Sequence, residues 1–231
     1  MIGVLFKYAA FTSMVYLMIP TALARFWSLG VISQLSAGGR VIITFDDGPD
    51  PKYTPRVLDV LKTAGVKACF FVVGEKALKH PEIIRKILSE GHEIGSHGFG
   101  HRIPWLMGPV GTLKDIKKSF QTIEDITGSP PVAYRPPWGL FSLSYWITRR
   151  IIRCDTVLWS FMSWDWSKRV TPEIIIKKIK QNIVDGSILI FHDSDTEPGA
   201  SAGSPEKMLC ALPEIINEVK QRGYKISPLK E

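Results

Sequence analysis

The feature that most limits the fold of this chain is a regular alternation of short apolar runs with amphipathic runs. The first apolar run, residues 41–45, has the continuous hydrophobic character of a strand that is buried on both faces. The next run begins with Thr54 and Pro55, which are typical of a helix N-terminus, and ends at Gly65. Further strand-like runs follow at residues 68–73, 92–96, 133–134, 157–159, 187–191 and 224–226.

This alternation indicates an α/β protein. Strands that alternate with helices form a mainly parallel sheet covered by helices. With about seven such strands, we expect a closed or nearly closed (β/α) barrel, and an open doubly wound sheet is the alternative. No G-x-G-x-x-G sequence follows the first strand, which weakens a nucleotide-binding version of that alternative.

The composition is that of one globular domain. Hydrophobic residues make up 45% and charged residues 22%, which excludes a disordered chain. The formal net charge is +7, but the basic residues are scattered at positions that a helix turns to solvent, so we expect no nucleic-acid partner. Cys69, Cys154 and Cys210 include no closely spaced pair, so a thiolate metal site is not expected. The sequence leaves open whether two of them form a disulfide.

The N-terminal segment carries no charge from Tyr8 to Ala24. A transmembrane helix needs about 17–25 such residues, and Ala22 to Ala24 has the small-x-small form of a signal cleavage site. A cleaved signal, an uncleaved anchor and a buried core helix all remain open, and we favour the anchor. We predict a signal peptide or membrane anchor at residues 1–36, a catalytic domain at 37–231, and an extracytoplasmic location, either membrane-anchored or secreted.

Reactive side chains follow the predicted strands at the ends where parallel α/β folds carry their active sites. Each one alone has an ordinary structural explanation, since Asp-Gly marks turns and a single histidine is usually structural. Their joint placement indicates one catalytic face. The residues are Asp46 and Asp47, His97, Arg135, Asp165, and His192 with Asp193.

Asp47, His97 and His101 could bind one metal ion. The histidines are four residues apart with two glycines between them, which suits a loop or a first helical turn. Two histidines and one carboxylate leave coordination positions open, as catalytic zinc sites do. Neighbouring carboxylates repel each other unless a cation binds one of them, so we expect Asp46 and Asp47 to have different roles.

Three further side chains suit the same face. Arg135 beside a catalytic carboxylate would lower its pKa and hold it in place. Trp138 and Trp166 could pack against sugar rings, although core packing is the usual role of tryptophan. His192 is a natural general acid because the pKa of imidazole lies near neutrality.

Four segments resemble the motifs of the polysaccharide deacetylases, the NodB homology domain of carbohydrate esterase family four. Residues 44–49 resemble the first motif, 97–101 the second, 135–138 the third and 190–192 the fifth, in matching order from about residue 41 to 224. The fourth motif departs from the family pattern, because Met162 stands where an acidic residue is common. This departure concerns substrate recognition more than catalysis.

The resemblance implies a distorted (β/α) barrel and a metal-dependent hydrolase that removes N-acetyl groups from amino sugars of a glycan such as peptidoglycan or chitin. It implies Zn²⁺ as the metal, with Co²⁺ as a substitute. By matched positions, it implies the following site residues: Asp46 as base, Asp47, His97 and His101 as metal ligands, Arg135 as the residue that orients the base, Trp138 as groove-lining aromatic, and His192 as acid. Asp165 and Trp166 remain from the fourth motif, so Asp165 is expected to support His192.

Three rival functions remain. An O-acetyl polysaccharide esterase and a deacylase of a lipid-linked sugar would use the same residues, whereas a glycan-binding protein would need neither the metal ligands nor His192. The presence of the whole set favours an enzyme whose partners are an acetylated glycan and, through the N-terminal segment, the membrane. Because no candidate catalytic residue precedes Asp46, we expect a chain that starts near Gly38 to keep its activity.

Overall fold

The computed structural model describes residue 8 and residues 11–230, and its centre is a parallel sheet. The strands run in the order β3–β2–β1–β5–β4, and β6 pairs with the beginning of β1. All of these pairings are parallel. The strands are β1 (Arg40–Asp46), β2 (Cys69–Val72), β3 (Glu93–Ser96), β4 (Phe161–Met162), β5 (Ile188–His192) and β6 (Lys225–Ile226).

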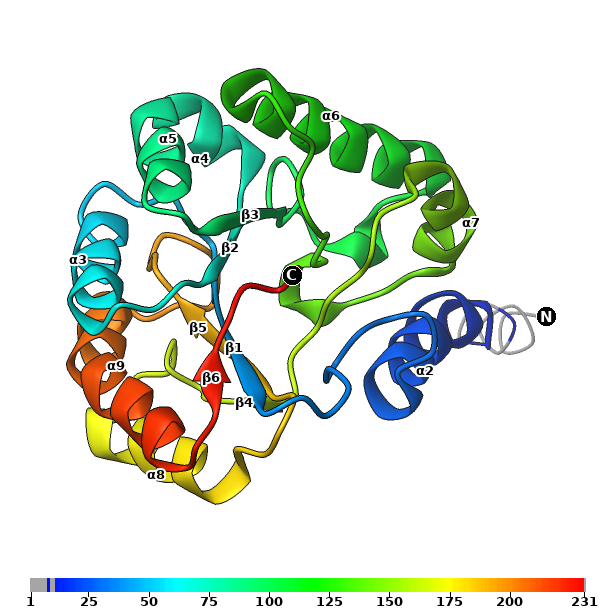
Figure 1. Cartoon of the computed structure of the whole chain (residues 1–231). Coiled ribbons are helices and arrows are strands. Elements are labelled where there is room, and N and C mark those ends of the chain that lie inside the picture. The colour runs from blue at the N-terminus through cyan, green and yellow to red at the C-terminus, as the bar shows by residue number, and fades with distance from the viewer. Residues whose placement is uncertain (1–7, 9–10, 231) are drawn as a thin grey trace.

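Helices form an outer layer around the strands (Figure 1). Helix α3 begins at the predicted residue Thr54, and α3, α5, α8 and α9 all have proline in their first turn, where no bonded N–H is needed. The helices are α2 (Ile19–Trp27), α3 (Thr54–Ala64), α4 (Gly74–Lys79), α5 (Pro81–Ser89), α6 (Pro109–Thr127), α7 (Leu143–Ile152), α8 (Pro172–Asn182) and α9 (Ser204–Gln221), with short turns η1 (Met14–Met18), η2 (Pro104–Leu106) and η3 (Pro137–Gly139).

Two short segments close the sheet into a distorted barrel. Tyr134 forms parallel bridges to Ser96 at the end of β3 and to Thr156, and the chain from Thr156 continues into β4, which pairs with β5. The predicted (β/α) barrel is therefore confirmed, but isolated bridges stand where continuous strands were expected at 133–134 and 157–159. Prolines at positions 130, 131 and 136 flank Tyr134 and have no N–H to donate, which keeps the pairing short.

The alternation of side chains along β1 separates the core from the active site. Ile43 and Phe45 pack into the main hydrophobic core, which includes residues of α3, α5, α8 and α9. Ile42 packs in a second cluster with residues of β2 and β5 inside the barrel. Because successive side chains point to opposite faces, Thr44 and Asp46 share the inner face with Ile42. A carboxylate is thus placed inside the barrel at its carboxyl end.

The residues that precede β1 also contact the barrel. Ala24 of α2 is fully buried, and Thr21 both donates to the carbonyl oxygen of Phe141 (2.8 Å) and accepts from its N–H (2.9 Å). Ile32 forms a parallel bridge to Val157. These contacts cross the predicted domain boundary at residue 36, which stays a prediction.

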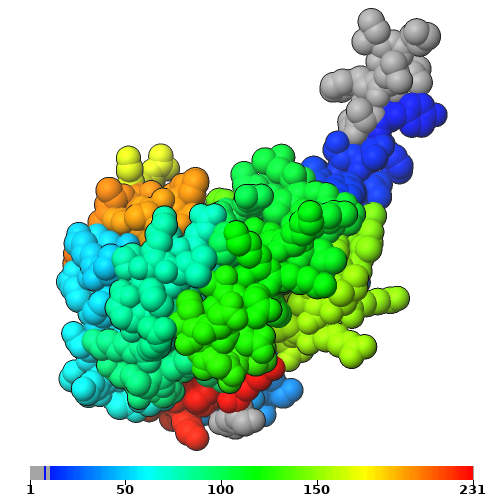
Figure 2. Space-filling view, turned by 90° about the horizontal axis from the view of Figure 1, so that it is seen from above, coloured from blue at the N-terminus to red at the C-terminus, as the bar shows by residue number. Residues whose placement is uncertain are grey.

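The predicted N-terminal anchor is only partly described, since residues 1–7, 9 and 10 lie outside the described residues. Figure 2 shows the blue segment that leads into α2 projecting beyond the body of the barrel. Within the described part, no helix is long and apolar enough to cross a bilayer. Cys69, Cys154 and Cys210 are free thiols, so no disulfide joins them.

Candidate active site

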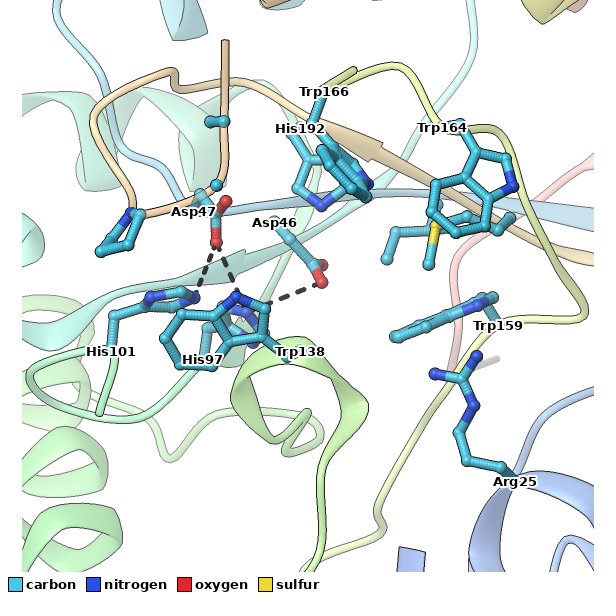
Figure 3. Close-up of a pocket in the computed structure, with 15 residues that line it drawn as sticks. Arg25, Asp46, Asp47, His97, His101, Trp138, Trp159, Trp164, Trp166 and His192 are labelled. Atoms are coloured by element: carbon cyan, nitrogen blue, oxygen red, sulfur yellow. Dashed lines mark ion pairs between the residues drawn. The ribbon is translucent and has the colours of Figure 1, made fainter. Parts of the chain in front are cut away.

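The three predicted metal ligands meet at the carboxyl ends of β1 and β3 (Figure 3). Oδ1 of Asp47 lies 3.2 Å from Nε2 of His101 and 3.5 Å from Nε2 of His97, and all three side chains are buried. Ligand atoms on a tetrahedral zinc ion, with bonds of about 2.1 Å, would lie about 3.4 Å apart. The arrangement therefore fits one small divalent ion.

Both histidines are held through their second ring nitrogen. Nδ1 of His97 lies 2.8 Å from the carbonyl oxygen of Arg135 and must donate to it, which leaves Nε2 unprotonated and free to bind a metal. Nδ1 of His101 lies 2.9 Å from Oε2 of Glu197, and the other carboxylate oxygen of Glu197, Oε1, pairs with Nζ of Lys76 at 2.7 Å. Such outer contacts fix the orientation of metal-binding imidazoles.

Two of the three triad side chains have the protonation state of a metal ligand. Burial would raise the pKa of Asp47, but the hydrogen bond with His101 and the positive charges of nearby histidines hold it below its usual range. Burial lowers the pKa of His97. Burial would also lower the pKa of His101, but its contacts with Asp47 and Glu197 raise it to about 9. Asp47 is thus ionised and His97 neutral, the forms that coordinate a metal, whereas His101 must lose its proton when a metal binds.

Asp46 is held by Arg135 inside the barrel. Nη1 of Arg135 donates to Oδ1 of Asp46 at 2.6 Å and to Oγ1 of Thr44 at 2.8 Å. The guanidinium is fully buried, and its other nitrogens donate to the carbonyl oxygens of Val157 and Leu158. The other oxygen of Asp46, Oδ2, lies 3.8 Å from Nε2 of His97. This oxygen can accept a proton beside the metal triad.

His192 lies on the side of the two carboxylates away from the metal-binding histidines (Figure 3), and Asp165 supports it. Nδ1 of His192 lies 3.0 Å from Oδ1 of Asp165, and its backbone N–H donates to Oδ2 at 2.8 Å. Ser163 also donates to Oδ1 of Asp165. Burial would lower the pKa of His192, but the Asp165 carboxylate raises it to about 10, with help from Asp47 and Asp46. The imidazole is therefore protonated at neutral pH and can donate a proton.

The first motif contains a glycine for a steric reason. A Cβ atom at Gly48 would lie 2.5 Å from the carboxylate oxygens of Asp193, the residue that follows His192. Burial raises the pKa of Asp193 to about 7, although a hydrogen bond from Thr54 opposes the shift. Gly48 therefore lets the loops after β1 and β5 pack directly against each other.

Strained backbone is concentrated at the site. Among the described residues, six that are not glycine have positive φ, and four of them line the pocket. These are Asp47 (φ 74°), His101 (46°), Trp138 (55°) and Trp164 (63°). Such conformations are costly for residues with a Cβ and cluster where function requires a precise side-chain direction.

A pocket of about 300 Å³ joins these groups. The structure brings all of the predicted site residues together, with Arg135 and Asp165 directly behind the lining residues Asp46 and His192. Trp138 packs against the ring of His101 with centroids 4.3 Å apart, and Trp166 lies 5.4 Å from Trp164. Met162 and Ile190, from the segments that resemble the fourth and fifth motifs, also line the pocket. The lining is completed by residues that the motifs did not indicate: Arg25, Trp159, Trp164, Pro198, Gly199 and Ala200.

Comparison with known proteins decides the family. A model of the polysaccharide deacetylase family matches residues 36–150. The chain is 32% identical to a peptidoglycan-N-acetylglucosamine deacetylase of Bacillus cereus, across 83% of this chain and 86% of that protein. The chain belongs to the polysaccharide deacetylase family. This polysaccharide deacetylase is also 31% identical to a chitooligosaccharide deacetylase of Sinorhizobium fredii, across 83% of this chain and 90% of that protein.

Solved structures agree with this assignment. A peptidoglycan N-acetylglucosamine deacetylase crystallised with 4-naphthalen-1-yl-N-oxidanyl-benzamide superposes with a TM-score of 0.79 and 31% identity, covering 86% of this chain and 90% of that one. The resemblance of the motifs is thus confirmed. The chain is a hydrolase that acts on the N-acetyl amide bonds of a polysaccharide, and its metal-binding triad fits the metal dependence of the family.

Proposed function

We propose that this polysaccharide deacetylase removes N-acetyl groups from amino sugars of peptidoglycan, with Zn²⁺ held by Asp47, His97 and His101. The observation that carries the proposal is that this triad shares one pocket with the Asp46–Arg135 and His192–Asp165 pairs. Two imidazoles and one carboxylate are a common ligand set of catalytic zinc, and Co²⁺ accepts the same ligands.

The side chains divide the reaction between a base and an acid. A divalent metal in the triad would supply Lewis-acid chemistry, which polarises the acetyl carbonyl and acidifies water. Asp46 accepts the proton of the attacking water through Oδ2, because Arg135 occupies Oδ1. His192 donates its Nε2 proton to the departing amine nitrogen while Asp165 holds Nδ1. The products are acetate and a free amino sugar.

The relatives and the aromatic lining support a glycan substrate. Trp138 and Trp166 offer apolar faces on which sugar rings can pack. Relatives that act on peptidoglycan and on chitooligosaccharides match this chain at nearly the same identity. Chitin oligomers are therefore the second candidate substrate.

We also propose that the N-terminal segment keeps the enzyme on the outer face of the membrane, where peptidoglycan lies. The support is the uncharged run from Tyr8 to Ala24 and the exposure of its apolar side chains, such as Phe11 and Met18. Cleavage after Ala24 would remove Thr21, whose side chain bonds to the barrel. This favours an uncleaved anchor, and an intact Met1 in membrane-fraction protein, seen by mass spectrometry, would support it.

Acetate release from peptidoglycan, chitin oligomers and acetylated xylan, measured in parallel, tests the proposed substrate. We expect the fastest release from peptidoglycan, complete loss of activity with a chelator, and recovery with Zn²⁺ or Co²⁺. Fast release from xylan alone would identify an O-acetyl esterase. Full activity in protein that elemental analysis shows to be free of metal would overturn the metal assignment.

A further inference from the structure

Helix α2 contributes a charged side chain to the active-site pocket. Arg25 lines the pocket together with Asp46 and His192, although it lies in the segment predicted as signal or anchor. Its position is defined by the preceding residues, since Ala24 is fully buried and Thr21 bonds to the backbone before α7. Figure 3 shows Arg25 approaching the pocket at the end away from Asp47 and His101.

The Arg25 side chain is exposed to solvent, but its guanidinium packs against an aromatic ring. Its central carbon is 4.5 Å from the ring centroid of Trp159, which is itself buried. A Cβ atom at Gly139 would lie 2.8 Å from Nη1 of Arg25 and 2.6 Å from the Trp159 ring, so only glycine leaves room for this pair. Gly139 directly follows Trp138, which places Arg25 beside the loop that forms one wall of the pocket. An arginine stacked on an aromatic ring keeps its N–H donors in a fixed plane.

Arg25 lacks a carboxylate partner within the described residues, whereas the other cationic groups of the site have one. Arg135 pairs with Asp46 at 2.6 Å and His192 pairs with Asp165 at 3.0 Å. No ion pair or hydrogen bond of the Arg25 side chain occurs among residues 8 and 11–230. Its donors remain available in a pocket that already holds the charges needed for deacetylation.

We propose that Arg25 binds an oxyanion carried by the substrate, a carboxylate or a phosphate on or next to the acetylated sugar. A guanidinium matches the two oxygens of such a group with parallel hydrogen bonds. The inference rests on the proposed function, and it makes the enzyme selective for anionic over neutral glycans. The lactyl carboxylate of a muramic-acid-containing glycan and the phosphate of a sugar 1-phosphate are the two sources of this chemistry.

The test compares substrates that differ in charge alone. kcat/KM is measured on a peptidoglycan tetrasaccharide with free lactyl carboxylates and on the same compound with those groups converted to amides. The ratio of the two values reports recognition of the anion. A second pair, N-acetylglucosamine 1-phosphate and its methyl glycoside, reports recognition of phosphate. The variants are Arg25→Gln, Arg25→Lys and, as a matched control, Arg150→Gln, which removes the same charge from an exposed site on α7.

We expect Arg25→Gln to lower the ratio for one of the two pairs by about ten-fold, because a charge-assisted hydrogen bond is lost. The ratio for Arg25→Lys should lie between those of the parent enzyme and Arg25→Gln, since lysine keeps the charge without the planar fork. Arg150→Gln should leave both ratios unchanged. The pair that responds identifies the source of the anion.

Two results would overturn the proposal. One is an unchanged ratio in Arg25→Gln for both pairs. The other is an equal fall in kcat/KM on charged and neutral substrates with a lower melting temperature, which would assign Arg25 a structural role. Absence of acetate release by the parent enzyme from every substrate would instead refute the proposed function.

Discussion

Oε2 of Glu197 lies 2.9 Å from Nδ1 of His101, so the loop after β5 supports a metal ligand that follows β3. Glu197→Gln should weaken metal binding about 10- to 100-fold, as loss of an outer partner of a metal-binding histidine does. Competition against a chromophoric chelator would measure this. Glu206→Gln removes an exposed carboxylate that pairs with Arg56 and should leave the affinity unchanged. Equal affinities in the parent protein and Glu197→Gln would contradict the supporting role.

Sequence patterns located the residues that end a strand or directly follow one. Asp46, Asp47, His97 and His192 could be found because strand ends converge in a parallel barrel and because their motifs are contiguous. Arg135 could be placed next to Asp46 only through the family resemblance, since the contact joins segments far apart in the chain.

The contributions of Glu197 and Arg25 could not be predicted in the same way. Glu197 lies in an irregular loop five residues after His192, and no motif or periodicity singles it out. Arg25 follows an apolar run whose length suggested a membrane segment, and nothing in that pattern reveals a contact with Trp159. Both contacts depend on tertiary packing, which periodicity along the chain does not encode.

Asp46 and Asp47 are adjacent but should behave differently when they are changed. Asp46→Asn should keep the metal and lose about 10²- to 10⁴-fold in kcat, the usual effect of removing a general base. His97→Ala should lose the metal itself, because its Nε2 faces Asp47. Metal content by elemental analysis and kcat from acetate release would be measured together. Equal metal loss in both variants would mean that Asp46 is a ligand and that the proposed roles are reversed.

The Asp165 carboxylate should control the alkaline limit of the reaction. The acid form of His192 is the active one, and its raised pKa of about 10 keeps it protonated well above neutral pH. Asp165→Asn removes the negative charge that opposes the effect of burial, so the pKa of His192 falls and activity is lost at a lower pH. The pH profile of kcat/KM would show this shift. Asp155→Asn, which changes an exposed carboxylate, should leave the pH profile unchanged. If the alkaline limit of the profile does not move in Asp165→Asn, His192 is not the acid.

The residues between Ile19 and the first strand should be needed for a stable barrel, which revises the expectation that a chain starting near Gly38 keeps its activity. Such a chain lacks the buried Ala24, the two hydrogen bonds of Thr21 and the bridge of Ile32 to Val157.

Burial of one aliphatic side chain contributes about 1.5–3 kcal/mol, and about 1 kcal/mol corresponds to roughly 2–4 °C in Tm for a domain of this size. The chain that starts at Gly38 should therefore melt at least about 3 °C below one that starts at Ile19, as followed by circular dichroism. The chain that starts at Ile19 keeps all of these contacts, so it should have the same melting temperature as the full-length protein. Equal melting temperatures for the two shortened chains would show that the segment only rests on a barrel that is complete without it.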